Sequence, residues 1–99
     1  MAPKAKAIII NENDNVATAL EALDAGATVS LEIQGRAERI KLLSAIPTGH
    51  KFALREIDAG AHVIKYGEPI GRTVVPITPG EHVHVHNIES PGKKVEGGQ

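Results

Sequence analysis

Three histidines occupy alternate positions near the end of the chain: His82, His84 and His86. On a β-strand successive side chains point to opposite faces, so the intervening Val83 and Val85 would face the core. The three imidazoles would then share the other face, with neighbouring Cα atoms about 7 Å apart. Imidazole binds divalent metals such as iron and zinc, and it also transfers protons near neutral pH. We therefore expect Glu81–Asn87 to be a strand that presents a metal-binding or substrate-contacting face.

The same alternation also fits an exposed edge strand without chemistry. On such a strand polar side chains alternate with buried valines whatever their function. Three of the five histidines of the chain fall in this short segment, which favours metal or substrate contact. The pattern does not separate a metal ligand from an acid or a base.

A second candidate follows a glycine in the middle of the chain. Gly49 allows a tight turn, and the next two residues, His50 and Lys51, offer a titratable ring and a cation to a carboxylate substrate. A histidine and a lysine after a surface turn are also common without any function. The pair gains weight only together with other residues.

A third candidate contains the single tyrosine of the chain. Lys65 and Tyr66 stand beside Gly67 and Pro69, a composition suited to a rigid loop in which the lysine could hold an anion. In the alternative, Tyr66 packs over the sheet and Lys65 extends into water. The glycines do not follow the spacing of a phosphate loop or a dinucleotide fingerprint.

The elements that carry these residues are expected to be mainly β with one short helix. Three consecutive isoleucines indicate a first strand at Ala7–Asn11. Asn13 or Asp14 could cap a helix that ends at Gly26. The apolar residues of that helix would follow helical spacing: Val16, Ala19, Leu20 and Leu23.

A β-hairpin is expected after this helix. Apolar residues alternate with polar ones from Val29 to Ile33, and the pattern resumes at Ile40 and Leu42. The residues between, including the charged stretch Arg36–Arg39, would form a long turn that faces water. After Pro47, many glycines and prolines predict short strands and many connections.

One phrase occurs three times in the sequence: Leu23–Val29, Ile57–Val63 and Ile77–Val83. Each has an apolar anchor, then a glycine, and then a valine that begins a strand. The intervals of 34 and 20 residues are unequal, so the phrase indicates a recurring turn and not a repeat array.

Length and composition predict one small domain over residues 7–88, between a flexible N-terminus at 1–6 and a flexible tail at 89–99. The net charge of -1 provides no field for nucleic acid or anionic lipid. The absence of cysteine excludes disulfides and thiolate metal sites. No apolar run is long enough for a signal peptide or a membrane span, so a cytoplasmic location is expected.

Three linked segments of the sequence resemble the N-terminal domain of altronate and galactarate dehydratases: Gly49–Leu54, Val63–Gly71 and Pro79–Asn87. The resemblance covers about residues 7–88. It implies a compact β-clip domain of the SAF (antifreeze-like) type that works with a much larger catalytic part. A chain of 99 residues would then be a separately encoded small subunit or an excised domain, inactive alone and able to form homo-oligomers.

The resemblance also implies a reaction and a cofactor. The expected enzyme is a hydro-lyase that removes water from a sugar acid such as altronate or galactarate. A divalent metal, Fe²⁺ or else Mn²⁺ or Zn²⁺, would assist and could require the large subunit for binding. Similar small subunits occur in sulfolactate sulfo-lyase, which eliminates sulfite. A non-catalytic ligand-binding or assembly module is the remaining alternative.

Matching positions carry the family's site onto this chain as an expectation. The implied catalytic residues are His50, His84 and His86. The implied substrate-binding residues are Lys51, Lys65, Tyr66 and Asn87. The implied metal ligands are His84 and His86, with His82 as a weaker third that could instead fix the loop.

Overall fold

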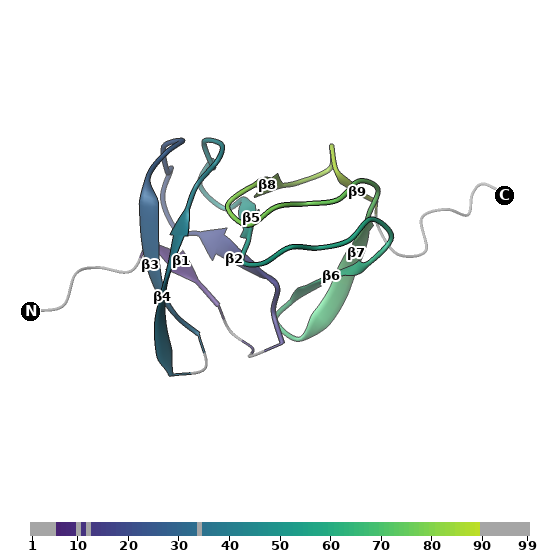
Figure 1. Cartoon of the computed structure of the whole chain (residues 1–99), viewed down its shortest axis with the longest axis horizontal. Coiled ribbons are helices and arrows are strands. Elements are labelled where there is room, and N and C mark those ends of the chain that lie inside the picture. The colour runs from purple at the N-terminus through teal and green to yellow at the C-terminus, as the bar shows by residue number, and fades with distance from the viewer. Residues whose placement is uncertain (1–5, 10, 12, 34, 90–99) are drawn as a thin grey trace, which may run out of the picture.

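The computed structural model describes residues 6–9, 11, 13–33 and 35–89, and these residues form β-strands and turns without any helix. The strands are β1 Ala7–Ile8, β2 Val16–Ala19, β3 Thr28–Ile33, β4 Arg36–Lys41, β5 Lys51–Ala53, β6 His62–Lys65, β7 Glu68–Thr73, β8 His82–Val83 and β9 Ile88–Glu89. They form three antiparallel sheets in the orders β1-β2-β5-β8, β3-β4 and β6-β7-β9. The β3-β4 ribbon and the β6-β7-β9 sheet lie at opposite ends, with β2, β5 and β8 between them (Figure 1). The mainly β prediction is confirmed.

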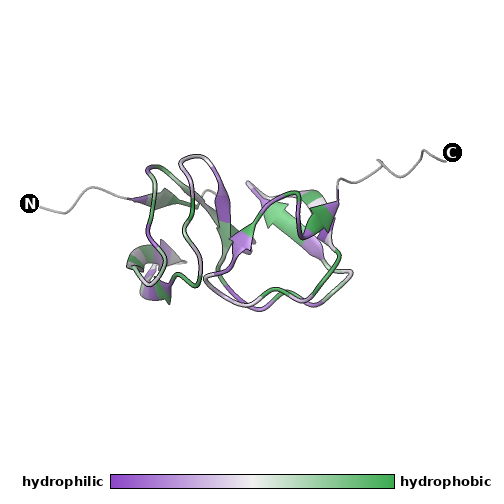
Figure 2. Cartoon of the chain, turned by 90° about the horizontal axis from the view of Figure 1, so that it is seen from above, coloured by the Kyte–Doolittle hydropathy of each residue, from purple (hydrophilic) through white to green (hydrophobic). Residues whose placement is uncertain are grey.

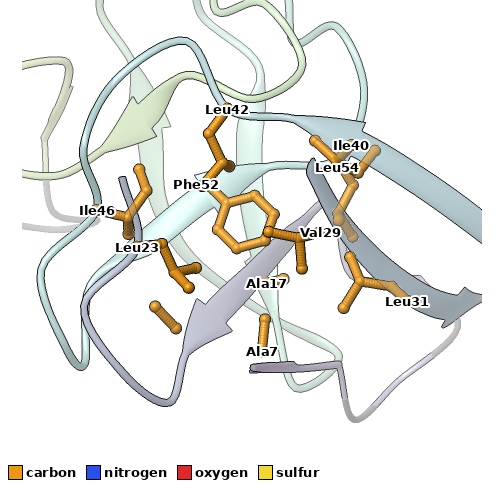
Figure 3. Close-up of a cluster of buried hydrophobic side chains, with 11 residues drawn as sticks. Ala7, Ala17, Leu23, Val29, Leu31, Ile40, Leu42, Ile46, Phe52 and Leu54 are labelled. Atoms are coloured by element: carbon orange, nitrogen blue, oxygen red, sulfur yellow. The ribbon is translucent and has the colours of Figure 1, made fainter. Parts of the chain in front are cut away.

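Two clusters of buried aliphatic side chains form the core. The first surrounds Phe52, which is fully buried and has Leu42 and Val29 beside it (Figure 3). The second lies under the β6-β7 hairpin and contains Val63 and Val83. Hydrophobic segments accordingly occur in both halves of the molecule (Figure 2). With little aromatic volume available, each half is filled by small, β-branched and leucine side chains.

Four tight turns of one type organise these strands. Each has a glycine with φ between 83° and 87° at its third position: Gly26, Gly49, Gly60 and Gly80. In each turn the residue after the glycine donates its N–H to the carbonyl three residues back, at 3.0 or 3.1 Å. A positive φ at this position is the mark of a type II turn and favours glycine. The thrice-repeated phrase is thus confirmed as turn chemistry, and a fourth copy begins at Ile46.

The turns face each other in pairs. Leu23 and Ile46 form one antiparallel bridge, and Ile57 and Ile77 form the other. The same hydrogen bond joins a strand end to a turn in both pairs. Gly49 N–H donates to the carbonyl of Ala19 at 2.9 Å, and Gly80 N–H donates to the carbonyl of Ala53 at 2.9 Å. The chain therefore consists of two similar halves that share β5.

The helix predicted to begin at Asn13 or Asp14 is wrong. Val16–Ala19 is strand β2, which pairs with β1 on one side and β5 on the other. Val16, Ala17 and Ala19 are all buried while Leu20 is half exposed, which no helical face would produce. Pairing on both edges and burial on both faces override the accidental helical spacing. Gly26 belongs to a turn and not to a helix end.

The predicted hairpin is present, but its charged tip is not. β3 and β4 pair from Thr28 with Lys41 to Ile33 with Arg36, which leaves two residues to connect them. Arg36–Arg39 is therefore part of β4, contrary to the long turn expected, because Gly35 with φ 77° closes a tight connection. Arg36 and Arg39 are nevertheless exposed, as predicted for this charged stretch, and Glu38 is partly buried.

The first strand is shorter than expected. It spans Ala7–Ile8 and pairs with the end of β2, whereas Ala7–Asn11 was predicted. Ile10 lies outside the described residues, as do nearly all of the predicted flexible segments at 1–6 and 89–99. No helix able to cross a membrane is found among the residues that the structure describes.

The glycine turns give a stability prediction. Replacing Gly60 by Ala should cost about 1–2 kcal/mol of unfolding free energy, because φ is 84° but a new Cβ meets open space. Replacing Gly80 by Ala should cost about 1–3 kcal/mol more, because φ is 87° and the Cβ would collide with the carbonyl of Lys41. Urea denaturation of both variants measures the difference. Equal losses would contradict the close packing of the Gly80 turn against β4.

Candidate active site: a histidine cluster

The segment Glu81–Asn87 does not continue as a strand, contrary to prediction. β8 ends at Val83, and residues 84–87 form a turn in which Val85 is 79% exposed. Asn87 explains the change, because its side chain accepts the N–H of His84 at 2.9 Å and its backbone N–H donates to the carbonyl of His84 at 3.0 Å. These local hydrogen bonds replace those of a sheet ladder. The expectation that Val85 faces the core is wrong.

The imidazoles nevertheless come together. His50 Nδ1 lies 2.9 Å from His82 Nε2, a hydrogen-bond distance. The ring of His50 stacks on that of His84 with centroids 4.1 Å apart. One ligand nitrogen from each of these three residues lies within 4.8 Å of the others. All three side chains are half-buried. We call His50, His82 and His84 the histidine cluster.

The turn pairs and the β5-β8 pairing build this cluster. His50 is the last residue of the turn around Gly49, and its carbonyl accepts the N–H of Ala19 at 2.8 Å. The strand that follows it, β5, pairs with β8, where Phe52 stands opposite His82. Two histidines separated by 32 positions in sequence thus become neighbours. The turns around Gly49 and Gly80 lead into β5 and β8, and their similar sequences were the signal that these two strands are related. The sequence analysis did not use that signal to pair them.

The cluster differs from the expected metal set in its membership. His82, predicted as the weaker third ligand, contacts all the other members of the group. His86, predicted as a main ligand, is exposed, and its ring lies 5.2 Å from that of His82 at a tilt of 32°. His86 is therefore adjacent to the three-nitrogen group without being part of it. The fifth histidine, His62, is exposed on β6.

Burial and positive neighbours favour the neutral form of His82 and His84. Burial lowers the pKa of His82, and His50, His86, His84 and Lys51 lower it further. The pKa of His84 is also lowered, first by burial and then by His50, Lys51 and His86. Neutral imidazoles keep a lone pair for a proton or a metal ion. The cluster is therefore able to act as a base or as a set of nitrogen ligands.

Lys51 adds positive charge beside the cluster, and Lys65 lies near Lys51. Burial and then the charge of Lys65 lower the pKa of Lys51, which is half-buried on β5. Lys65 Nζ lies 4.8 Å from the centroid of the Tyr66 ring, a cation–π distance. A bound carboxylate would relieve the repulsion between the two ammonium groups. Substrate binding by Lys51, Lys65 and Tyr66 stays a prediction that this geometry suits.

The buried side chain of Asp14 fixes the turn that follows Lys65. Tyr66 and Gly67 both have positive φ, 57° and 78°, and form the two-residue turn between β6 and β7. Gly67 N–H donates to Asp14 Oδ1 at 2.8 Å, and Asp14 is 1% exposed. Asn15 accepts the N–H of Ile64 at 2.8 Å. The sequence analysis missed Asp14 and Asn15 as positioning residues because it placed them at a helix start.

Asn87 is buried under the cluster. It is 1% exposed, and its Nδ2 donates to the carbonyl of His82 at 2.8 Å while its Oδ1 accepts the N–H of His84. Both side-chain groups are used within the turn. This geometry argues for a positioning role and against the direct substrate contact that was predicted for Asn87.

Comparison with known families identifies the domain. The model of the altronate/galactarate dehydratase SAF domain matches residues 5–91. The chain belongs to this family, as the three linked segments of the sequence predicted.

Curated relatives fall into two kinds. Altronate dehydratase of Escherichia coli is 48% identical over 83 residues, which are 84% of this chain and 16% of that protein. The (2R)-sulfolactate sulfo-lyase subunit alpha of Chromohalobacter salexigens is 47% identical over 57 residues, 58% of this chain and 61% of that protein. The corresponding subunit of Paracoccus pantotrophus is 46% identical over 52 residues, 52% of this chain and 78% of that protein. The matches therefore cover a small part of the dehydratase and more than half of each alpha subunit.

The position of Asn87 gives a stability prediction. Asn87→Ala should lower the unfolding free energy by about 1–3 kcal/mol, because the N–H of His84 and the carbonyl of His82 lose their partner in a buried setting. Asn13→Ala is the matched control, since Asn13 is exposed and a change there should stay within about 0.5 kcal/mol. Thermal or urea unfolding measures both. A neutral Asn87→Ala variant would refute the positioning role.

The lowered pKa values give a pH prediction. Unfolded histidines titrate near their ordinary value of 6.5, whereas His82 and His84 in the folded chain titrate below it. As pH falls past that value the unfolded state takes up more protons, so the folded state loses stability. Urea denaturation should show the unfolding free energy falling from about pH 7.5 to about pH 5.5. The double variant His82→Asn, His84→Asn should show a flatter dependence, and an unchanged slope would contradict the assignment.

Proposed function

We propose that this domain supplies a histidine-lined, positively charged face to a lyase centre that acts on a hydroxy-acid carboxylate and that a larger catalytic polypeptide completes. The observation that carries the proposal is the convergence of His50, His82 and His84 from two distant chain segments, with Lys51 beside them. Membership of the dehydratase SAF family supports the lyase class.

The cluster fits a divalent metal ion by its donor chemistry. Three imidazoles, each with a ligand nitrogen within 4.8 Å of the others, suit iron or zinc, and Mn²⁺ is the alternative. His50, His82 and His84 would hold the ion, with His86 next to them. When bound, such an ion supplies positive charge that stabilises the enediolate formed next to a carboxylate. We propose Fe²⁺ as the resident metal.

The reaction is a β-elimination in which this chain's groups bind the substrate and move a proton. The proton next to the carboxylate is removed, its electron pair forms the carbon–carbon double bond, and the bond to the leaving group breaks. Lys51 and Lys65 would hold the carboxylate. The lone pair of an imidazole cannot bind an ion and accept a proton at once, so His50 or His84 would move the proton only in a cluster without an ion. With the ion on His50, His82 and His84, the exposed ring of His86 beside His82 would take the proton and return it to the departing hydroxide, which leaves as water.

A larger partner is proposed because the site is open. The cluster residues are half-buried, and Val85 and His86 next to them are exposed. The altronate dehydratase match covers 16% of that protein, so its remaining chain has room for the rest of a catalytic centre. In this proposal the isolated domain has negligible turnover.

Sulfite elimination is the second candidate, and the similarity to two sulfo-lyase subunits favours it. The alpha subunits of (2R)-sulfolactate sulfo-lyase are 47% and 46% identical to this chain, over 61% and 78% of their own length. In that reaction the carbon–sulfur bond breaks and sulfite leaves in place of hydroxide. The residues assigned here to the carboxylate and the proton serve both reactions.

The test is reconstitution with a large lyase polypeptide, which is to be sought first among the reading frames next to the one for this chain. The mixture should turn over altronate, galactarate or sulfolactate, and either part alone should not. His50→Ala and His84→Ala should lower kcat of the mixture by at least about 100-fold, because proton transfer and charge stabilisation are lost. His62→Ala is the matched control, since His62 is exposed and lies outside the cluster.

Metal binding provides a separate measurement on the same variants. Titration calorimetry with Fe²⁺ in the absence of air should show loss of binding for His50→Ala and His82→Ala and retention for His62→Ala. Near-wild-type turnover of both His50→Ala and His84→Ala would refute the catalytic assignment. Unchanged kcat with weakened substrate affinity would instead indicate a non-catalytic binding module.

A further inference from the structure

Exposed apolar side chains gather on the segments that flank the histidine cluster. Among the described residues, six large hydrophobic side chains are exposed: Leu20, Leu43, Tyr66, Val74, Val75 and Val85. Isolated exposed residues of this kind are common and need no explanation. Three of these six, however, belong to or are hydrogen-bonded to the segment Gly80–Asn87, which carries three of the histidines: Leu43, Val74 and Val85.

Backbone hydrogen bonds establish this neighbourhood. The N–H of Leu43 donates to the carbonyl of Gly80 at 2.9 Å, and the N–H of Val74 donates to the carbonyl of Asn87 at 3.0 Å. Val75 follows Val74 and is 44% exposed, and Pro76 after it is exposed as well. Three consecutive exposed apolar residues are unfavourable on a free surface and are kept where they serve contact.

Val85 is the most exposed of the six and is held rigidly. It is 79% exposed at the tip of the turn between His84 and His86. The turn is fixed by the side chain of Asn87 and by the backbone bond from Ile88 N–H to the carbonyl of His84 at 3.2 Å. A flexible loop could bury Val85 against its neighbours. A fixed turn that displays an apolar side chain loses little entropy when a partner covers it.

We propose that the exposed side chains of Val74, Val75 and Val85 together form the docking surface for the larger catalytic polypeptide, with Val85 inserted into a pocket of that partner. The inference rests on the proposed function, because it assigns the partner's contact to the margin of the same cluster. The match covers 16% of altronate dehydratase and leaves 84% of that protein outside it. A polypeptide of that size is large enough to carry the pocket that would receive Val85. Covering this surface excludes water from the histidines and strengthens their electrostatic interactions with a substrate.

The test measures association apart from chemistry. Val85→Glu should raise the dissociation constant for the large lyase polypeptide at least tenfold, because a charge would have to enter an apolar contact. The free chain should keep the wild-type urea midpoint of unfolding, since Val85 is exposed. Leu20→Glu is the matched control, because Leu20 is 50% exposed and its N–H bonds to Lys6, away from the cluster, and its affinity should equal that of wild type.

Turnover separates the outcomes. At saturating concentrations the Val85→Glu chain should restore kcat to near the wild-type value, which supports a docking role distinct from catalysis. Wild-type affinity for Val85→Glu overturns the docking surface and leaves the proposed function standing. Failure of the wild-type chain to bind the large polypeptide overturns both. If sedimentation shows a wild-type dimer that Val85→Glu dissociates, the surface belongs to a second copy and the inference is overturned.

Discussion

The structure depends on the pairing of one three-residue strand with neighbours on both sides. β5 contributes Phe52 to the first core cluster and Ala53 to the second, and both residues are fully buried. Its antiparallel pairing with β2 and β8 joins the two halves of the domain. The same pairing places the turn that carries His50 next to the strand that carries His82. The hydrophobic contacts that stabilise the fold therefore also assemble the candidate site.

Glycine turns make this arrangement possible in so short a chain. At φ near 85° an ordinary residue is strained, so each turn requires glycine and reverses the chain within four residues. The second pair of turns repeats the first, and the residue that follows the glycine is His50 in one and Glu81 in the other. The two pairs of turns share one backbone geometry but differ in this side chain, so only the first contributes a histidine to the cluster at this position. The glycine stabilises each turn, and the residue after it is free to serve a function.

The site brings several basic side chains close together, and an anion bound there would reduce their mutual repulsion. Burial and cationic neighbours lower the pKa values of Lys51, His82 and His84, so removing any one charge would favour protonation of the others. A carboxylate substrate, a metal ion or a partner's acidic residue would change that balance. In the proposed function, another polypeptide covers the exposed valines and completes this surface. Family membership in the dehydratase SAF domains agrees with a part that works within a larger enzyme.

Sequence alone determined the mainly β class, the β3-β4 alternation, the turn phrase, the family and the candidate histidines, because each depends on local spacing or on the resemblance. Tertiary structure alone decided that Val16–Ala19 is a central strand, since pairing and burial on both sides outweigh helical spacing. It also decided which imidazoles meet: Asn87 ends the expected strand after Val83, and β5 brings His50 to His82. Contacts between residues more than 30 positions apart are set by packing, which no local pattern records.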